Sequence, residues 1–234
     1  CVFFVYYSTP LFINLIYNYF MNKINTYKVT RFFLFPLIII ADYLQTNCTK
    51  NFTPMNMGPV ADPIWRKTIL KHLSKKNFVI DYGCGVGFFC KLFDSKKYLG
   101  LEVNKNFIER AKKINKNYNF FEVNDKKIII YKKKINAIFI NNVLHHMSDN
   151  QVSKALKFLK KNSRKSTKVL IIEPLFPENF FSLQFFLKAL DIGDFIRTKK
   201  HYLKIIEKEV RVKGSYAKKF GIGTAIIFHG YLKK

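Results

Sequence analysis

The sequence has few acidic side chains for its size. Its 234 residues contain 15 Asp and Glu against 41 Lys and Arg, which gives a formal net charge of +26. Such an excess of one sign ordinarily indicates an anionic partner, either nucleic acid or a membrane surface. Only six of the basic residues are Arg, however, and Lys, Asn, Ile and Phe are abundant together. An AT-rich coding sequence produces this mixture by itself, so we favour a solvated Lys-rich surface.

Cysteine is also scarce, with four residues: Cys1, Cys48, Cys84 and Cys90. They form neither a C-x-x-C pair nor the spacing of a zinc site, so we expect no metal centre. Reduced thiols in a cytoplasmic protein are the interpretation that this usage favours.

Long uninterrupted apolar runs are missing as well. Residues 1–22 carry no charge, but a proline and two asparagines interrupt them, and the run at 32–41 contains another proline. A membrane-spanning helix needs ~20 apolar residues, and a signal peptide needs positive charge ahead of its apolar run. We therefore treat residues 1–57 as an extension. It is either non-native sequence before the true start or a segment that associates weakly with membranes.

From Asp62 onward, strands and helices alternate regularly. Asp62 and Pro63 are suited to the start of a helix that runs to residue 76. Short apolar runs predict five strands, at 77–81, 97–102, 118–123, 135–140 and 167–173. Helical patterns lie between them, at 86–95, 104–115 and 149–161. This alternation predicts parallel strands with helices on both faces of the sheet.

The pattern changes after residue 174. One apolar helix, at about 179–190, precedes two strands at 209–217 and 223–232, which a short Gly-containing turn joins into an antiparallel hairpin. No repeat or linker divides the chain. We therefore expect residues 58–234 to form one α/β domain, a doubly wound, seven-stranded, mostly parallel sheet with an antiparallel C-terminal hairpin.

A glycine-rich stretch, DYGCGVG at 81–87, follows the first strand. Ligands of such sheets bind at the carboxyl ends of the strands, where glycine lets a ligand approach the backbone closely. The next helix would direct its free N–H groups at an anionic part of that ligand. Gly83, Gly85 and Gly87 form G-x-G-x-G rather than the dinucleotide fingerprint. Asp81 is better suited to an ammonium group than to a pyrophosphate.

Two further acids complete a ligand pattern. Glu102 ends the second strand about 20 residues after the first glycine, where a carboxylate can bind both hydroxyls of a ribose. Asp125 follows the third strand, where its side chain could accept from an adenine amino group. An amino-acid end, a ribose and an adenine together describe S-adenosylmethionine.

The successive segments VIDYGCGVG, YLGLEVNKNFIERAKK, FFEVND, NAIFINNVLHHMSD and KVLIIEP resemble the motifs of class I S-adenosylmethionine-dependent methyltransferases, over residues 60–175. The later segment ALDIGDFIRTKKHYLKII is similar to one in bacterial small-molecule members. The resemblance implies a Rossmann-like fold with strand order 3-2-1-4-5-7-6. It also implies these cofactor contacts: Asp81, Gly83, Cys84, Gly85 and Gly87 for the methionine part, Glu102 for the ribose, Asp125 for the adenine, and Asn141 for the cofactor's edge.

Several polar residues near the strand ends have open roles. His145 and His146 are candidates for a general base, although one of them more simply links the fourth strand to its helix. Glu173 either faces the acceptor or caps the next turn. Two roles are equally compatible with Arg197, His201 and Tyr202: they bind an anionic acceptor, or they form ion pairs at the surface. We therefore assign no catalytic residue.

The expected function is methyl transfer to a small-molecule acceptor, with residues 175–202 covering the pocket. One alternative is an RNA or other nucleic-acid methyltransferase, which only the charge supports. The segment INNVLHH, at 140–146, lacks the proline that amino-methylating nucleic-acid enzymes carry there. A second alternative is a protein that binds S-adenosylmethionine without catalysis, against which the complete glycine loop and both acids argue.

Overall fold

The computed structural model describes residues 61–123, 131, 134–175, 195–220 and 223–233. All of them belong to one compact unit, formed by Thr49–Phe176 and Gly193–Lys234. Four expectations lie wholly or largely outside the described residues: the extension at 1–57, the adenine contact of Asp125, the helix at about 179–190, and the cover of the acceptor pocket by residues 175–202.

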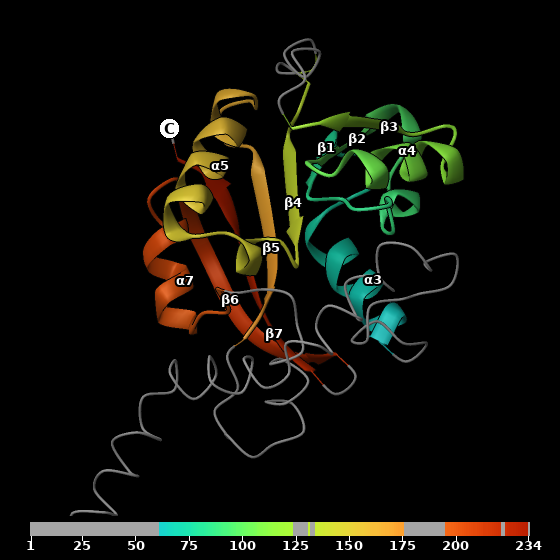
Figure 1. Cartoon of the computed structure of the whole chain (residues 1–234). Helices are drawn as coiled ribbons and strands as arrows, with labels where there is room; N and C mark the ends of the chain where they lie inside the picture. Colours follow the sequence, from blue (N-terminus) through green and yellow to red (C-terminus); the bar gives the residue numbers. More distant parts are fainter. Residues whose placement is uncertain (1–60, 124–130, 132–133, 176–194, 221–222, 234) are drawn as a thin grey trace, which may run out of the picture. The chain divides into compact units, whose positions relative to one another are not determined.

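Seven strands form one sheet in the order β3-β2-β1-β4-β5-β7-β6 (Figure 1). The strands are β1 (Val79–Tyr82), β2 (Tyr98–Glu102), β3 (Asn119–Glu122), β4 (Ala137–Asn141), β5 (Lys168–Pro174), β6 (Val210–Phe220) and β7 (Gly223–Leu232). Strands β1 to β5 pair in parallel, whereas β7 is antiparallel to both β5 and β6. The expected fold class, strand order and C-terminal hairpin are therefore confirmed.

Helices cover both faces of this sheet (Figure 1). On one face, α3 (Ala61–His72) and α4 (Lys105–Ile114) pack on a core that includes Trp65 and Phe139. On the other, α5 (Asp149–Lys161) and α7 (Lys199–Ile206) pack on a second core with Ile140 and Phe228. Asn104, Ser148 and Thr198 accept backbone N–H bonds at the starts of α4, α5 and α7, which fixes where each helix begins.

The helix expected at 86–95 is wrong. This segment forms turns and two short 3-10 helices, η1 (Cys90–Leu92) and η2 (Ser95–Lys97). Gly87 has a φ of 78°, a left-handed conformation that interrupts an α-helix. The predicted helix N-terminus behind the glycine loop is therefore not formed, and it cannot supply free N–H groups to a ligand.

The topology brings three strand ends to one edge. β1 lies between β2 and β4, with Asp81 paired to Gly100 on one side and to Phe139 on the other. The chain order reverses at β1, and in such sheets ligands bind outside the carboxyl ends of the strands at this point. Glu102 and Asn141 are the last residues of the two flanking strands, so the expected site residues meet at this edge.

Within the described parts of residues 61–233, no helix has both the length and the apolar character needed to cross a membrane.

Candidate functional site

The glycine loop (residues 83–87) is a tight backbone turn between β1 and η1. Its three glycines have φ values of 73°, 53° and 78°, all in the region that residues with a side chain rarely adopt. The N–H groups of Gly83 and Cys84 both donate to the carbonyl of Leu101, at 2.7 and 3.2 Å, which ties the loop to β2. The loop is thus positioned by the sheet rather than by a following helix.

The three glycines have different surroundings. A Cβ atom on Gly83 would lie 2.3 Å from Cγ2 of Val143, and one on Gly87 would lie 2.6 Å from the Phe120 ring. Among the described residues, a Cβ atom on Gly85 would meet no other atom within 4 Å. Gly83 and Gly87 are therefore required by packing, whereas no described residue occupies the position that a side chain on Gly85 would take.

Glu102 connects β2 to this loop. Its Oε2 accepts from the N–H of Gly85 at 2.9 Å, and its Oε1 accepts from the N–H groups of Val103 and Asn104 at 2.7 and 3.0 Å. Only 8% of the residue is exposed. Three backbone donors hold the carboxylate in place beside Gly85, with acceptor capacity left for other donors.

Asp81 lies in the interior beneath the loop, with 3% of its surface exposed. Its Oδ2 accepts a hydrogen bond of 2.6 Å from the hydroxyl of Tyr98. Burial raises the pKa of Asp81 from 3.8 to about 7; the Tyr98 bond opposes this shift and the nearby Glu102 adds to it. This carboxyl group can therefore change its charge near neutral pH.

Cys84 is buried inside the loop, and its thiol lies 3.6 Å from the carbonyl oxygen of Gly85. Burial, followed by the charges of Asp81 and Glu102, raises the pKa of this thiol well above its ordinary value. Since the thiolate is the reactive form, Cys84 is suited to packing under the loop rather than to covalent chemistry.

Asn141 closes β4 at the same edge. Its Oδ1 atom is buried and has no hydrogen-bond partner among the described residues. The next residue, Asn142, has a φ of 55° and starts a tight turn, residues 142–147, which we call the β4 turn. A buried acceptor without a donor is costly unless a ligand supplies one, so Asn141 fits a binding role.

Glu173 and His145 prove to hold the β4 turn. Glu173 is fully buried, and its carboxylate accepts from Nδ1 of His145 at 2.9 Å. The carboxylate also accepts from the N–H groups of Val143, Leu144 and His145. Glu173 was expected to face the acceptor or to cap the next turn, and the structure shows it bonded instead to the turn after β4. His145 is the histidine that links β4 to the helix after it.

Arg197 was expected to bind an anionic acceptor or to form a surface ion pair. It does form an ion pair, with Asp149 at 2.9 Å, but the arginine is 4% exposed and directs its remaining donors at backbone carbonyls. His201 also bonds to Asp149, at 2.8 Å. Partial burial would raise the pKa of Asp149, but hydrogen bonds from His201 and Arg197 lower it overall. Tyr202 is buried and donates to the carbonyl of Pro174.

Three residues at this edge were missed by sequence reasoning. Tyr98 holds Asp81, and Val143 covers Gly83. Val103, directly after Glu102, is an apolar side chain with 74% of its surface exposed. The position of Val103 next to the acid was visible in the sequence, whereas the other two contacts join residues that are far apart along the chain.

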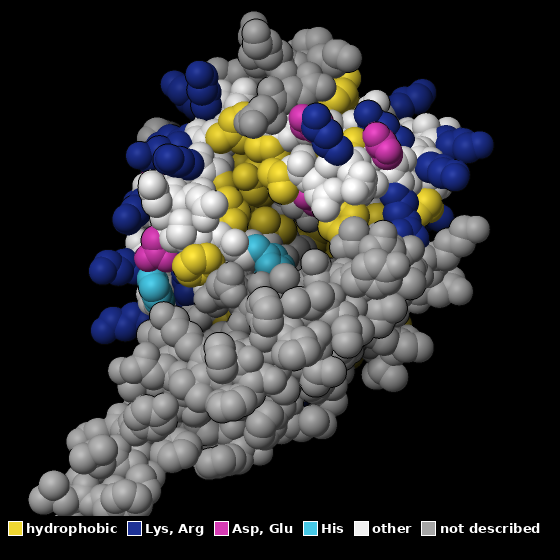
Figure 2. Space-filling view, in the orientation of Figure 1, with side chains coloured by type: hydrophobic (Ala, Val, Ile, Leu, Met, Phe, Trp, Pro, Cys, Tyr) yellow, Lys and Arg dark blue, Asp and Glu magenta, His cyan; other side chains and the backbone are white. Residues whose placement is uncertain are grey.

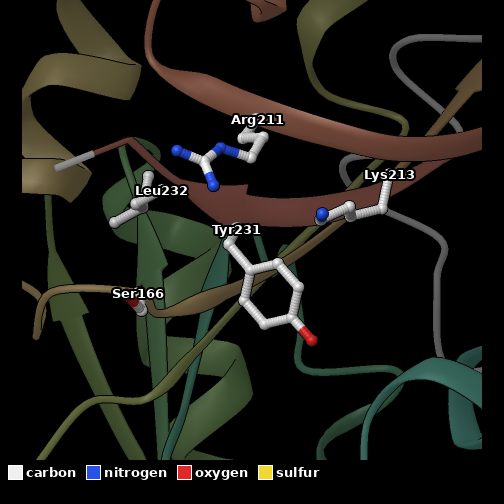
Figure 3. Close-up of a pocket in the computed structure, with 5 residues that line it drawn as sticks. All are labelled: Ser166, Arg211, Lys213, Tyr231 and Leu232. Atoms are coloured by element: carbon white, nitrogen blue, oxygen red, sulfur yellow. The ribbon is translucent and has the colours of Figure 1, made fainter.

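A separate hollow of about 260 Å³ lies near the start of β5, at the opposite edge of the sheet. Ser166, Arg211, Lys213, Tyr231 and Leu232 line it (Figure 3). It is cationic, and none of the expected site residues contributes to it. Among the described residues, no cluster of three or more His, Cys, Asp or Glu side chains could hold a metal ion.

The fold and this edge of the sheet define a methyltransferase. A family model described as a methyltransferase domain matches residues 60–191, more than half of the chain. The chain belongs to this family. It is an S-adenosylmethionine-dependent methyltransferase, and S-adenosylmethionine is its cofactor. A comparison with curated proteins gives no match.

Solved structures share the fold at low sequence identity. A SAM-dependent methyltransferase from Aquifex aeolicus is 19% identical, with a TM-score of 0.55 over 78% of this chain and 100% of that one. A protein from Pyrococcus horikoshii is 14% identical, with a TM-score of 0.59 over 81% and 98%. The geranyl diphosphate C-methyltransferase of Streptomyces coelicolor is 10% identical, with a TM-score of 0.55 over 73% and 79%.

Proposed function

We propose that the glycine loop, Glu102 and Asn141 bind S-adenosylmethionine and that the chain transfers its methyl group to a small-molecule acceptor. The observation that carries this proposal is the surroundings of Gly85. No atom of the described residues lies within 4 Å of the position of its missing Cβ, while its N–H bonds to a carboxylate that retains acceptor capacity. A ligand with hydroxyl groups needs a carboxylate that is fixed in position to accept from them. It also needs room to lie against the backbone beside that carboxylate.

Each residue then has a physical role. Glu102 accepts from the ribose hydroxyls, the exposed Val103 side chain packs on the adenine, and Asn141 meets the cofactor's edge. Asp81 supplies negative charge near the ammonium group. Gly83, Cys84 and Gly87 shape the loop by packing, and Asp125 remains our prediction for the adenine amino group.

When bound, the cofactor supplies an electrophilic methyl group on a sulfonium. The protein then needs to hold the acceptor in line with that group and to exclude water. A general base is required only for an acceptor that starts protonated. Glu173, His145 and Arg197 are already bonded within the fold, so they leave this chemistry to other groups.

A small-molecule acceptor is supported by the absence of proline after β4 and by one neighbour, whose acceptor is geranyl diphosphate. The cationic hollow lies at the opposite edge from the glycine loop, so its two cations are not placed beside the proposed methyl donor. We also assign the chain to the cytoplasm, because Cys84 and Cys90 are buried free thiols.

The acceptor class is tested by binding to mixed RNA and DNA at about 50 and 200 mM salt, together with transfer of a labelled methyl group. Attraction to phosphates alone falls steeply with salt, because it arises from counterion release. We expect weak binding that the higher salt abolishes, and no labelled polymer.

The matched variant is Arg211→Ala with Lys213→Ala, which removes the two cations of the hollow. It should reduce polymer binding at low salt and leave cofactor affinity unchanged. Tight polymer binding at the higher salt, accompanied by methylation of the polymer, would overturn the small-molecule assignment.

A further inference from the structure

The β4 turn is held by two buried charged side chains from distant parts of the sequence. Glu173 has no exposed surface, and Arg197 is 4% exposed. The turn directly follows Asn141 and contains Val143, whose side chain covers Gly83 of the glycine loop. Its conformation therefore sets the geometry of two parts of the proposed cofactor site.

Glu173 binds the donors of the turn. Its carboxylate accepts from three successive N–H groups, those of Val143, Leu144 and His145, at 2.9, 2.7 and 3.2 Å. Successive N–H groups that converge in this way form an anion-binding concavity, and here a side chain of β5 is the anion. Nδ1 of His145 adds a fourth contact, at 2.9 Å.

Arg197 binds the acceptors of the same turn. Nη1 donates to the carbonyls of Leu144 and Phe195 at 2.7 and 2.8 Å, and Nη2 donates to the carbonyl of Met147 at 2.5 Å. Nη2 and Nε both donate to Oδ1 of Asp149, at 2.9 and 3.0 Å. These bonds use all five donors of the guanidinium, so the arginine cannot be replaced by a lysine without loss.

The two charges act from opposite sides of the backbone, one on its N–H groups and the other on its carbonyls. Buried charges add little net stability, because removal from water offsets their attraction, but they can specify one arrangement. Arg197 also bridges to Leu175, directly after β5, and Phe195 donates to the carbonyl of His145. The chain that leaves β5 at Leu175 thus returns beside the same turn at Phe195.

We propose that Glu173 and Arg197 are positioning residues for methyl transfer. They hold the β4 turn so that Asn141 and Val143 present a preformed surface to the cofactor. This inference rests on the proposed function. Neither residue touches the cofactor, and both act through the turn between them.

The test is the affinity for S-adenosylhomocysteine, the product that methyl transfer leaves, measured by calorimetry on the full chain. Arg197→Lys keeps the charge but loses the fork of donors, and Glu173→Gln keeps the shape but loses the anion. We expect each to weaken binding by about tenfold, because binding must then restore an arrangement of the turn that a charge-assisted hydrogen bond no longer holds. Amide hydrogen exchange at residues 143–145 should become faster in both variants.

The control is Leu159→Ala, which opens a cavity in the core beneath α5, ~15 Å along that helix from its first turn. It should lower the unfolding temperature but change the affinity by less than about twofold. If Arg197→Lys and Glu173→Gln bind like the wild type, or if Leu159→Ala weakens binding equally, the positioning role is wrong. If the wild type itself does not bind, the proposed function fails first.

Discussion

At the scale of single residues, Asp81 has an unusual environment. It is a carboxyl group with 3% exposure whose hydrogen-bond donor is a neutral phenol, the hydroxyl of Tyr98. Burial raises its pKa from 3.8 to about 7, so the folded protein keeps this proton to a higher pH than the unfolded chain does. The favourable contribution of Asp81 is therefore complete below pH 3.8 and lost as the pH rises through about 7.

This linkage predicts the effect of Asp81→Asn on stability without cofactor. Between pH 5 and 8, the wild type should lose about 2–4 kcal/mol of unfolding free energy relative to the variant, because Asn does not ionise. Urea unfolding at several pH values measures the difference. Tyr98→Phe is the control: it removes the donor that favours the charged form and should steepen the loss. A constant difference between wild type and Asp81→Asn across this range would contradict the account.

At the scale of elements, the glycine loop and the β4 turn pack directly on each other through Gly83 and Val143. A Cβ atom on Gly83 would lie 2.3 Å from Cγ2 of Val143 and 2.9 Å from Cγ1. The turn is held in place by Glu173, so Val143 has little freedom to move away. The loop and the turn therefore form one unit, although about 60 residues separate them.

This contact predicts that Gly83→Ala is destabilising by about 2–4 kcal/mol, from overpacking together with left-handed backbone strain. Val143→Ala in the same chain should restore part of that loss, which gives a favourable coupling in a double-mutant cycle of unfolding free energies. Gly85→Ala, with strain but no overlap, should cost about 1 kcal/mol. Equal losses for Gly83→Ala and Gly85→Ala, or no coupling with Val143→Ala, would show that the packing contact is unimportant.

The elements could largely be predicted from the sequence, because strand alternation and strand-end acids are local signals. The helix expected at 86–95 failed, because Gly87 adopts a φ of 78° and packs against Phe120 of β3, and neither feature is a local signal in the sequence. The main partners of Arg197 could not be predicted either, because they are backbone carbonyls in a turn about 50 residues earlier. A pattern of side chains does not indicate which distant backbone groups will lie beside it.

At the scale of the whole molecule, acidic side chains are rare, yet they make up most of the buried charges in the described part of the chain. The buried charged residues of the described chain are Asp81, Glu102, Glu173 and Arg197, so three of the four are acids in a protein of net charge +26. Figure 2 shows Lys and Arg side chains around the margin of the described face, with hydrophobic side chains gathered toward its middle. Two of these acids, Glu102 and Asp81, lie at the glycine loop, which suits a cofactor that carries ammonium and sulfonium groups.

The most direct test of S-adenosylmethionine binding at this edge is a calorimetric titration of the wild type and of Gly85→Val. A side chain on Gly85 would meet no atom of the described residues within 4 Å, so the cost to the variant is the strain of a φ of 53°, and circular dichroism and thermal unfolding verify that it folds. The account predicts saturable binding by the wild type and none by the folded variant, since the valine fills the volume of the ligand. Equal affinity in the two proteins, or a wild type that does not bind, would contradict it.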